Sequence, residues 1–285
     1  MIKYFIKKNS IFILLIIFQL SSYVISSNIY PEPQISSQLY NIPKKYFISA
    51  TNLISLLNEN HTYFYLIDVR NKNEYNNLKI PTSINIPIYA IKTKKFLKNK
   101  HIILINSGYA YKSLINECKI LSKHGFKHFS ILEGGIYSWL KANKRLDGNT
   151  FSFEQVNKIS PEAFFEDKNY KEVLFFEICN SGVSKNRSVI PNSHCLVFNG
   201  NINQLISDIK NYLIKLESDP LYIVIASNNT ALYTKIEKPI YKSINEFVFF
   251  LKGGLPNYEK FLKNQHAIWQ YNHVIKSKKE CGACN

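Results

Sequence analysis

Short apolar runs alternate along the chain with longer segments in which apolar residues recur every three or four positions. Three runs have the length of β-strands and are rich in Ile, Phe and Tyr, at 63–69, 101–106 and 128–134. In the longer segment 111–126, Leu114, Cys118 and Leu121 fall on one face of a helix, and Gly125 is placed to end it. The alternation predicts an α/β fold, in which helices cover both faces of a parallel sheet.

The chain contains an internal repeat. Five stretches of the first half recur in the same order in the second half, beginning at residues 48, 65, 80, 102 and 131. Their counterparts lie 111, 109, 110, 120 and 119 residues further on, so one register holds with a ten-residue insertion. The sequence therefore predicts two tandem domains, at 46–145 and 157–265, joined by a linker at 146–158 and followed by a tail at 266–285.

Composition supports a folded chain without assigning it a nucleic-acid partner. Of 285 residues, 46% are hydrophobic and 14% aromatic, which is enough for packed cores and argues against disorder. The formal net charge is +16, but the lysines are spread along the whole chain, without a basic stripe or a nucleic-acid motif. We therefore expect no nucleic-acid binding.

The first 26 residues have the pattern of a signal peptide. Lys3, Lys7 and Lys8 precede an uninterrupted apolar run at 11–18, and residues 24–26 offer a cleavage site. The apolar run is shorter than the roughly 20 residues of a membrane span. The sequence predicts export to a periplasm or outside the cell, and the alternative is an uncleaved N-terminal membrane anchor.

The five cysteines show no disulfide-framework spacing. Cys118 is expected to be a buried apolar residue of its helix, while Cys179 is expected at a strand end close to the second loop. Cys195 follows His194, but neighbouring strand residues point to opposite faces, which argues against an activated pair. Cys281 and Cys284 form a C-x-x-C that fits a redox pair, half of a metal site or a passive disulfide.

The stretch "NSGYAYKS", 106–113, lies between a predicted strand and a predicted helix. Ligands of parallel sheets bind beyond the carboxyl ends of the strands, so this is where a reactive loop is expected. The stretch contains no Cys, His or acidic residue. Either the loop has no chemistry of its own, or the chemistry lies elsewhere in the chain.

Several spaced motifs of the first repeat resemble those of rhodanese domains. They are "DVR" with "EY" after it, at 68–70 and 74–75, "IPTSINIP" at 80–87, the strand–loop–helix, and "LEGGIYSW" at 132–139. The second repeat resembles a diverged copy. The resemblance implies α/β domains in which a loop cysteine carries a sulfane sulfur, within the pattern Cys-x-x-Gly-x-Arg-Ser.

Both loops depart from the family pattern at the cysteine. In the first, Ser107 stands at the Cys position, Ala110 at the Gly, Lys112 at the Arg and Ser113 at the Ser; in the second, Ser227 stands at the Cys. A serine oxygen cannot hold a sulfane sulfur as a thiolate does. The resemblance also implies that Asp68 and Arg70 brace the loop, and their counterparts in the second repeat are Glu177 and Cys179.

Two functions of different classes remain open. The first is a non-catalytic binding or structural module, whose partner is a protein or a sulfur carrier that the sequence does not name. The second is a sulfurtransferase or thiol-redox protein that uses Cys281 and Cys284. We expect no cofactor and no metal site. We also expect Ser107→Cys to load a persulfide, provided that the loop directs its N–H groups at that side chain.

Overall fold

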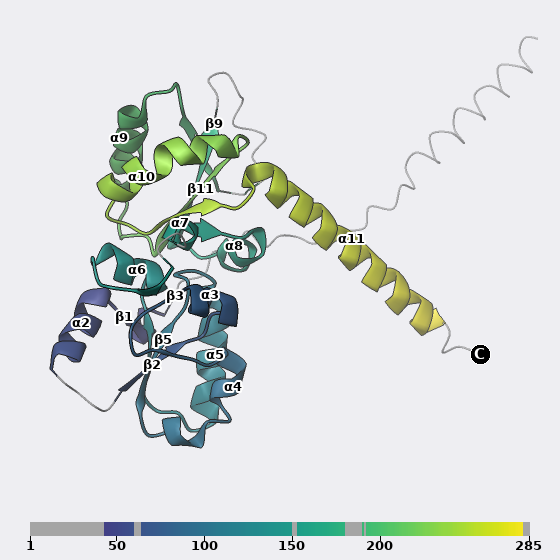
Figure 1. Cartoon of the computed structure of the whole chain (residues 1–285). Helices are drawn as coiled ribbons and strands as arrows, with labels where there is room; N and C mark the ends of the chain where they lie inside the picture. Colours follow the sequence, from purple (N-terminus) through teal and green to yellow (C-terminus); the bar gives the residue numbers. More distant parts are fainter. Residues whose placement is uncertain (1–42, 60–63, 150–152, 180–189, 191, 282–285) are drawn as a thin grey trace, which may run out of the picture. The chain divides into compact units, whose positions relative to one another are not determined.

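A computed structural model describes residues 43–59, 64–149, 153–179, 190 and 192–281, with side chains as far as residue 268. The described residues all belong to one compact unit, Gln38–Asn285, drawn in colour in Figure 1. The expected signal peptide at 1–26 and Cys284 lie outside the described residues. Within the described part of the chain, no helix is both long enough and apolar enough to cross a membrane.

The first half forms a parallel sheet of five strands in the order β1-β6-β5-β2-β4. Its strands are β1 (Phe47–Ile48), β2 (Phe64–Asp68), β4 (Ile84–Asn85), β5 (His101–Ile105) and β6 (Phe129–Leu132). Its helices are η1 (Lys44–Tyr46), α2 (Ala50–Asn58), α3 (Lys72–Asn77), α4 (Ile88–Ile91), η2 (Lys95–Leu97), α5 (Tyr111–Lys123) and α6 (Gly135–Lys141). A small antiparallel pair joins β3 (Leu78–Lys79) to β7 (Asp147–Gly148).

The second half forms another parallel sheet, in the order β10-β9-β11-β12-β8. Its strands are β8 (Lys158–Ile159), β9 (Val173–Cys179), β10 (His194–Val197), β11 (Tyr222–Ser227) and β12 (Val248–Leu251). Its helices are α7 (Phe153–Val156), α8 (Pro161–Asp167), α9 (Ile202–Leu213), η5 (Thr230–Leu232), α10 (Tyr233–Ser243) and α11 (Gly254–Cys281). Read from β8, the strands follow one another as they do from β1, so the two predicted α/β domains are confirmed by the topology.

Local structure repeats together with the topology. Ser49 begins α2 by accepting a hydrogen bond from the Asn52 N–H, and Ser160 begins α8 in the same way with the Ala163 N–H. A serine hydroxyl in this position satisfies one of the N–H groups that a helix start leaves without an acceptor. The same dipeptide, Ile-Ser, therefore precedes α2 in the first half and α8 in the second half.

Both sheets are buried on their two faces, which explains the continuous apolar runs of the sequence. In the first half, α2 and α6 cover one face while α4 and α5 cover the other (Figure 1). In the second half, α9 and α10 cover one face while α8 and α11 cover the other. As expected, Cys118 is completely buried on the core side of α5, and Gly125 follows the helix with a φ of +86°.

The two halves share one apolar core. The α5 side of the first sheet and the α8 side of the second sheet contribute to the same cluster of buried residues. Aromatic rings join the halves there: Tyr111 lies 6.2 Å from Tyr222, and Tyr109 and Tyr137 each lie 5.2 Å from Phe249, between ring centroids. The halves therefore pack as one unit rather than as two separately solvated domains.

Three connecting segments contain regular structure. The linker at 146–158 contains β7 and α7 in addition to irregular backbone. After the second loop, α10 continues through Pro239 to Ser243. Proline removes one helical hydrogen bond, but Ile236 and Ile240 are fully buried on the same helix and hold it against the core. The expected tail at 266–285 continues α11 as far as Cys281.

Candidate functional site

A cavity of about 290 Å³ opens at the carboxyl end of β5, where parallel sheets bind ligands. Its lining comes from the loop after β5, from the turn after β2, and from α3, α4 and α5. The lining residues are Val69, Arg70, Glu74, Ile88, Asn106, Ser107, Tyr109, Ala110, Ser113 and Leu114. Ser107, the residue at the position of the sulfur-carrying cysteine, therefore lies where the sequence places a reactive side chain.

The loop after β5 is held by its own backbone and by Asn106. The Asn106 side chain accepts a hydrogen bond from the Gly108 N–H at 2.9 Å and donates one to the Tyr109 carbonyl at 2.6 Å. Gly108 has a φ of +96°, and a Cβ there would lie 2.4 Å from the Gly134 carbonyl oxygen. Ala110 has a φ of +58°, which fits its alignment with a family glycine, because glycine adopts this conformation without strain.

Ser107 and Tyr109 both line the cavity. Burial raises the pKa of Tyr109, and the nearby Glu74 carboxylate raises it further. The phenol therefore stays neutral at pH 7 and does not act as a base toward Ser107. Among the described residues that line the cavity none is a histidine, so the usual activation of a serine nucleophile is missing.

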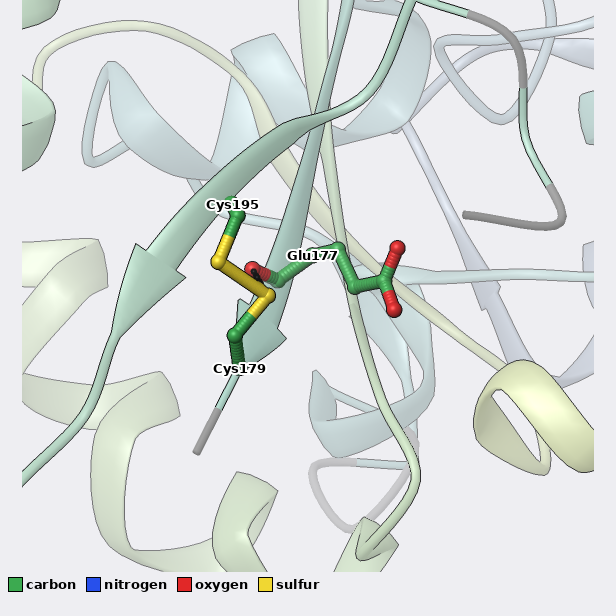
Figure 2. The surroundings of a disulfide bond; sticks show 3 residues. All are labelled: Glu177, Cys179 and Cys195. Carbon is green, nitrogen blue, oxygen red and sulfur yellow. Dashed lines mark hydrogen bonds between the residues drawn. A yellow bond between two sulfur atoms is a disulfide. The ribbon is translucent and has the colours of Figure 1, made fainter. Parts of the chain in front are cut away.

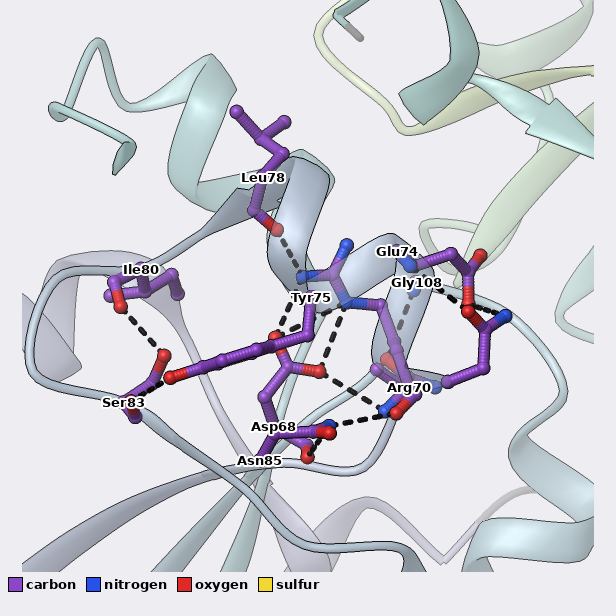
Figure 3. A network of polar contacts seen from close by, with 11 residues as sticks. Asp68, Arg70, Glu74, Tyr75, Leu78, Ile80, Ser83, Asn85 and Gly108 are labelled. Atoms are coloured by element: carbon purple, nitrogen blue, oxygen red, sulfur yellow. Dashed lines mark hydrogen bonds and ion pairs between the residues drawn. The ribbon is translucent and has the colours of Figure 1, made fainter. Parts of the chain in front are cut away.

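Asp68 and Arg70 form a buried ion pair beside the cavity (Figure 3). The Arg70 Nη2 donates to the Asp68 carboxylate at 2.7 Å and to the Leu78 carbonyl at 2.5 Å. The Asn85 side chain donates to the Asp68 and Arg70 carbonyls. This network fixes the turn between β2 and α3 and ties it to β3 and β4, and the Arg70 side chain also forms part of the cavity wall.

Lys112 and Ser113, which align with the family Arg and Ser, differ in their surroundings: Ser113 lines the Ser107 cavity and Lys112 does not. The Lys112 side chain lines a different cavity, of about 350 Å³, together with Asn116, Lys119 and Tyr170, and it is not among the residues that line the Ser107 cavity. The Ser113 hydroxyl donates to the Glu166 carboxylate at 2.6 Å. Lys112, which aligns with the family Arg, is therefore not part of the wall of the Ser107 cavity.

The sequence analysis missed Asp167, the last residue of α8. Its carboxylate lies at the N-terminus of α5. Its carboxylate accepts hydrogen bonds from the N–H groups of Tyr111 and Lys112, at 2.8 and 2.9 Å, and from the Tyr222 hydroxyl at 3.0 Å. Asp167 is completely buried, and burial raises its pKa to about 6 against the opposing effect of the three hydrogen bonds. In the first repeat the aligned residue is Leu56. An acidic residue at a position that is apolar in the other repeat was therefore the signal in the sequence that could have indicated a special role for Asp167.

Persulfide loading by Ser107→Cys requires that the loop N–H groups point at the new side chain. Three of these N–H groups donate to other residues instead. Those of Tyr111 and Lys112 donate to Asp167, and that of Gly108 donates to Asn106. A low thiol pKa requires donors and a helix N-terminus aimed at the sulfur. The substitution is therefore no longer expected to restore persulfide loading by itself.

The second loop is closed around its serine. Ser227 is the last residue of β11 and is buried. Its N–H donates to the Tyr233 hydroxyl at 3.0 Å, and its own hydroxyl accepts from the Asn229 N–H at 3.1 Å. A Cβ on Gly254 would lie 2.2 Å from the Ser227 carbonyl oxygen, so the backbone packs tightly against this residue.

Cys179 and Cys195 are joined by a disulfide between the neighbouring strands β9 and β10 (Figure 2). In the parallel register Cys195 pairs with Glu177 and Cys179 with Val197, so both sulfurs lie on one face of the sheet. Cys179 is thus not the free thiol considered for the second loop, and it forms a disulfide although the cysteine spacing showed no disulfide framework. Cys118 is free, and burial raises its pKa to about 12, which suits a packing residue.

The remaining two cysteines lie at the end of the described chain. Cys281 is the last residue of α11, and Cys284 lies beyond the described residues. Within the described residues, no group of three or more His, Cys, Asp or Glu side chains is arranged to hold a metal ion.

Comparison with known proteins agrees with this fold. Residues 49–142 match the family model of the rhodanese-like domain. The BH2092 protein of Bacillus halodurans is 25% identical, covering 39% of this chain and 89% of its own, with a TM-score of 0.33. The rhodanese-like domain of the Alr3790 protein from Anabaena sp. is 25% identical, covering 38% and 82%, with a TM-score of 0.33.

A more distant similarity is to the RPA3614 protein of Rhodopseudomonas palustris, described as a possible tyrosine phosphatase. It is 19% identical, covering 35% of this chain and 83% of its own, with a TM-score of 0.32. No curated protein matches the chain significantly.

Proposed function

We propose that this chain, in which residues 49–142 form a rhodanese-like domain, is an exported binding or structural module without sulfurtransferase activity. The observation that carries the proposal is the bonding around Ser107. A sulfur carrier needs a thiolate, which the loop must stabilise with N–H groups and a helix N-terminus. Ser107 supplies a hydroxyl, and the N–H groups of Tyr111 and Lys112 at that helix donate to Asp167.

The cavity next to Ser107 supports the binding part of the proposal. It combines apolar walls from Val69, Ile88 and Leu114 with the hydroxyls of Ser107 and Tyr109. A mostly apolar cavity with a few converging polar groups is the usual form of a ligand or peptide side-chain site. The second half, with Ser227 enclosed by its own loop, supports a structural role for that half.

The alternative function uses Cys281 and Cys284. These two are the cysteines left after the Cys179–Cys195 disulfide and the buried Cys118. They favour thiol chemistry by elimination. A sulfur-transfer measurement separates the two functions.

We predict that the purified chain without residues 1–26 transfers no sulfur from thiosulfate to cyanide and releases no thiocyanate on direct cyanolysis. Ser107→Cys is expected to behave in the same way, because the loop N–H groups remain bonded to Asp167 and Asn106. Thiocyanate formation is measured colorimetrically, with an active rhodanese as the positive control.

Sulfur transfer by the wild type would contradict the proposed function. If that activity disappears in the double variant Cys281→Ser/Cys284→Ser, the alternative function replaces it. If it survives, the reduced Cys179–Cys195 pair becomes the source of the thiol, which Cys195→Ser tests directly.

Export is the second part of the proposal. The positive, apolar and cleavage-site regions at 1–26 support it, and so does the Cys179–Cys195 disulfide, because disulfides persist in oxidising compartments. We predict that the mature chain begins close to residue 27 and is found outside the cytoplasm. Mass spectrometry of the native N-terminus measures this. A soluble cytoplasmic protein that begins at Met1 would contradict it, and an uncut chain in the membrane fraction would indicate the anchored alternative.

A further inference from the structure

The start of α5 carries a set of hydrogen-bond donors that act together. The first N–H groups of a helix have no acceptor within the helix, and the helix dipole places partial positive charge there. At α5, which is 13 residues long, two of these N–H groups belong to Tyr111 and Lys112. Ala110 is the N-cap residue that precedes the helix, and its side chain accepts no hydrogen bond from these N–H groups. The donors must therefore be satisfied from another part of the chain.

The acceptor comes from the other half of the molecule. Asp167 is separated from Tyr111 by 56 residues and from Lys112 by 55, and its two carboxylate oxygens take one N–H each. A third donor, the Tyr222 hydroxyl from β11, bonds to the oxygen that also accepts from Tyr111. Asp167, Tyr111 and Tyr222 are completely buried against the shared aromatic core, while the Lys112 N–H is partly buried. The three donors thus form a cradle of the kind that binds small oxyanions.

The surroundings of Asp167 on its own helix do not favour a carboxylate. Asp167 is the last residue of α8, where the helix dipole is negative and an anion is destabilised. The exposed Glu166 carboxylate next to it adds like-charge repulsion. The stabilising contacts come from α5 of the first half and from β11 of the second half. The Asp167 side chain therefore bonds two N–H groups of the opposite half instead of capping its own helix.

A second contact links the halves in the opposite direction. The Lys141 ammonium at the end of α6 donates to the carbonyls of Ile244, Asn245 and Glu246, at 2.6, 2.9 and 2.9 Å. These carbonyls directly follow the C-terminus of α10, where a cation is favoured. Each half therefore provides one charged side chain to a helix end of the other half, an acid at a positive end and a base at a negative end.

We propose that the N-terminus of α5 is an anion-binding site which the chain fills with its own carboxylate, Asp167, as an internal ligand. The internal ligand joins the two halves and closes this helix end to external anions, and removal of the Asp167 side chain opens the site to a small free carboxylate. The inference goes beyond the proposed function and does not depend on it, because it concerns binding to N–H groups and not sulfur chemistry.

The test is rescue of the full mature chain carrying Asp167→Ala by sodium formate. Without an anion, the variant leaves three buried donors unsatisfied, and its thermal midpoint falls. Formate replaces the missing carboxylate, so the midpoint rises by about 3 °C at ten times the dissociation constant and continues to rise with the logarithm of the formate concentration. Sodium chloride at the same ionic strength, and formate added to the wild type, provide the reference for general salt effects.

Glu166→Ala is the matched control, because it removes the neighbouring exposed carboxylate, which makes no contact with the two α5 N–H groups. We expect this variant to respond to formate as the wild type does. An equal response to formate and chloride in Asp167→Ala would overturn the proposal, as would an equal response in all three proteins. If Asp167→Ala is unfolded at 25 °C, refolding by formate and not by chloride, followed by circular dichroism, supports the proposal, and its absence overturns it.

Amide hydrogen exchange provides an independent readout in the same proteins. The Tyr111 and Lys112 N–H groups are expected to be protected in the wild type, exposed in Asp167→Ala and protected again with formate. Protection in Asp167→Ala without formate would mean that another group supplies the acceptor, and the internal-ligand role of Asp167 would then be wrong.

Discussion

Replacing Arg70 with Met is expected to lower the free energy of unfolding by about 3–5 kcal/mol at pH 7. Asp68 is completely buried, and the Arg70 guanidinium supplies three of its hydrogen bonds. Methionine fills much of the same space but leaves the Asp68 carboxylate without a counter-charge and the Leu78 carbonyl without its donor. Urea unfolding followed by circular dichroism measures the change.

The chain offers a matched control for this substitution. Arg145 forms an ion pair with Asp147, but its side chain is 87% exposed. Arg145→Met removes the same charge from a solvated pair, for which we expect a loss of at most about 1 kcal/mol. The double variant Asp68→Asn/Arg70→Met should be more stable than Arg70→Met alone, because it leaves no unpaired buried charge. Equal losses at Arg70 and Arg145 would contradict the role assigned to burial.

The two-domain α/β fold follows from the sequence because its determinants are local. Strand runs buried on both faces, helix periods of three and four, and paired Ile-Ser helix starts all recur in one register. Each of these features is set by neighbouring residues, so it survives the divergence of the second half. The positions of Ser107 and Ser227 at the ends of β5 and β11 follow from the same register.

The sequence alone did not predict which cavity the Lys112 side chain lines. An alignment places the residue one turn from Ser107, but the side chain turns toward a separate cavity beside α8. That direction depends on how α5 enters from Ala110, whose φ of +58° rotates the first turn. The effect of one backbone conformation on the following side chains is not readable from residue types alone.

Asp167 and the Cys179–Cys195 disulfide were missed for a different reason. Both depend on contacts between segments that are distant or offset along the chain. The disulfide requires that β9 and β10 be neighbours with Cys195 opposite Glu177, and Asp167 requires that α8 of one half meet α5 of the other. Aligning the two repeats predicts the order of strands and helices within each half. It does not predict which residues of one half contact the other half.

The second large effect concerns Asp167 and pH. The titratable groups that face its carboxylate are Glu166 on its own helix, Tyr170 close by, Tyr111 on α5 and Tyr222 on β11. Burial raises the pKa of each of the three tyrosines above its usual value of 10, so they remain neutral between pH 4 and pH 7. Asp167→Asn leaves these groups and Glu166 in place, and the difference between wild type and variant therefore reports the Asp167 carboxyl.

The unfolding free energy of the wild type, relative to Asp167→Asn, is expected to fall as the pH rises from about 4 to about 6. Burial raises the pKa of Asp167 from 3.8 to about 6 in the native state. Within this window the native chain still holds the proton while the unfolded chain has released it, so rising pH favours the unfolded chain. The full difference is roughly 3 kcal/mol, and it should level off above pH 6.5. Urea unfolding of both proteins at pH 4, 5, 6 and 7 measures it. A difference that increased with pH would mean that the N–H groups of Tyr111 and Lys112 and the Tyr222 hydroxyl outweigh burial, and that the native pKa lies below 3.8 instead.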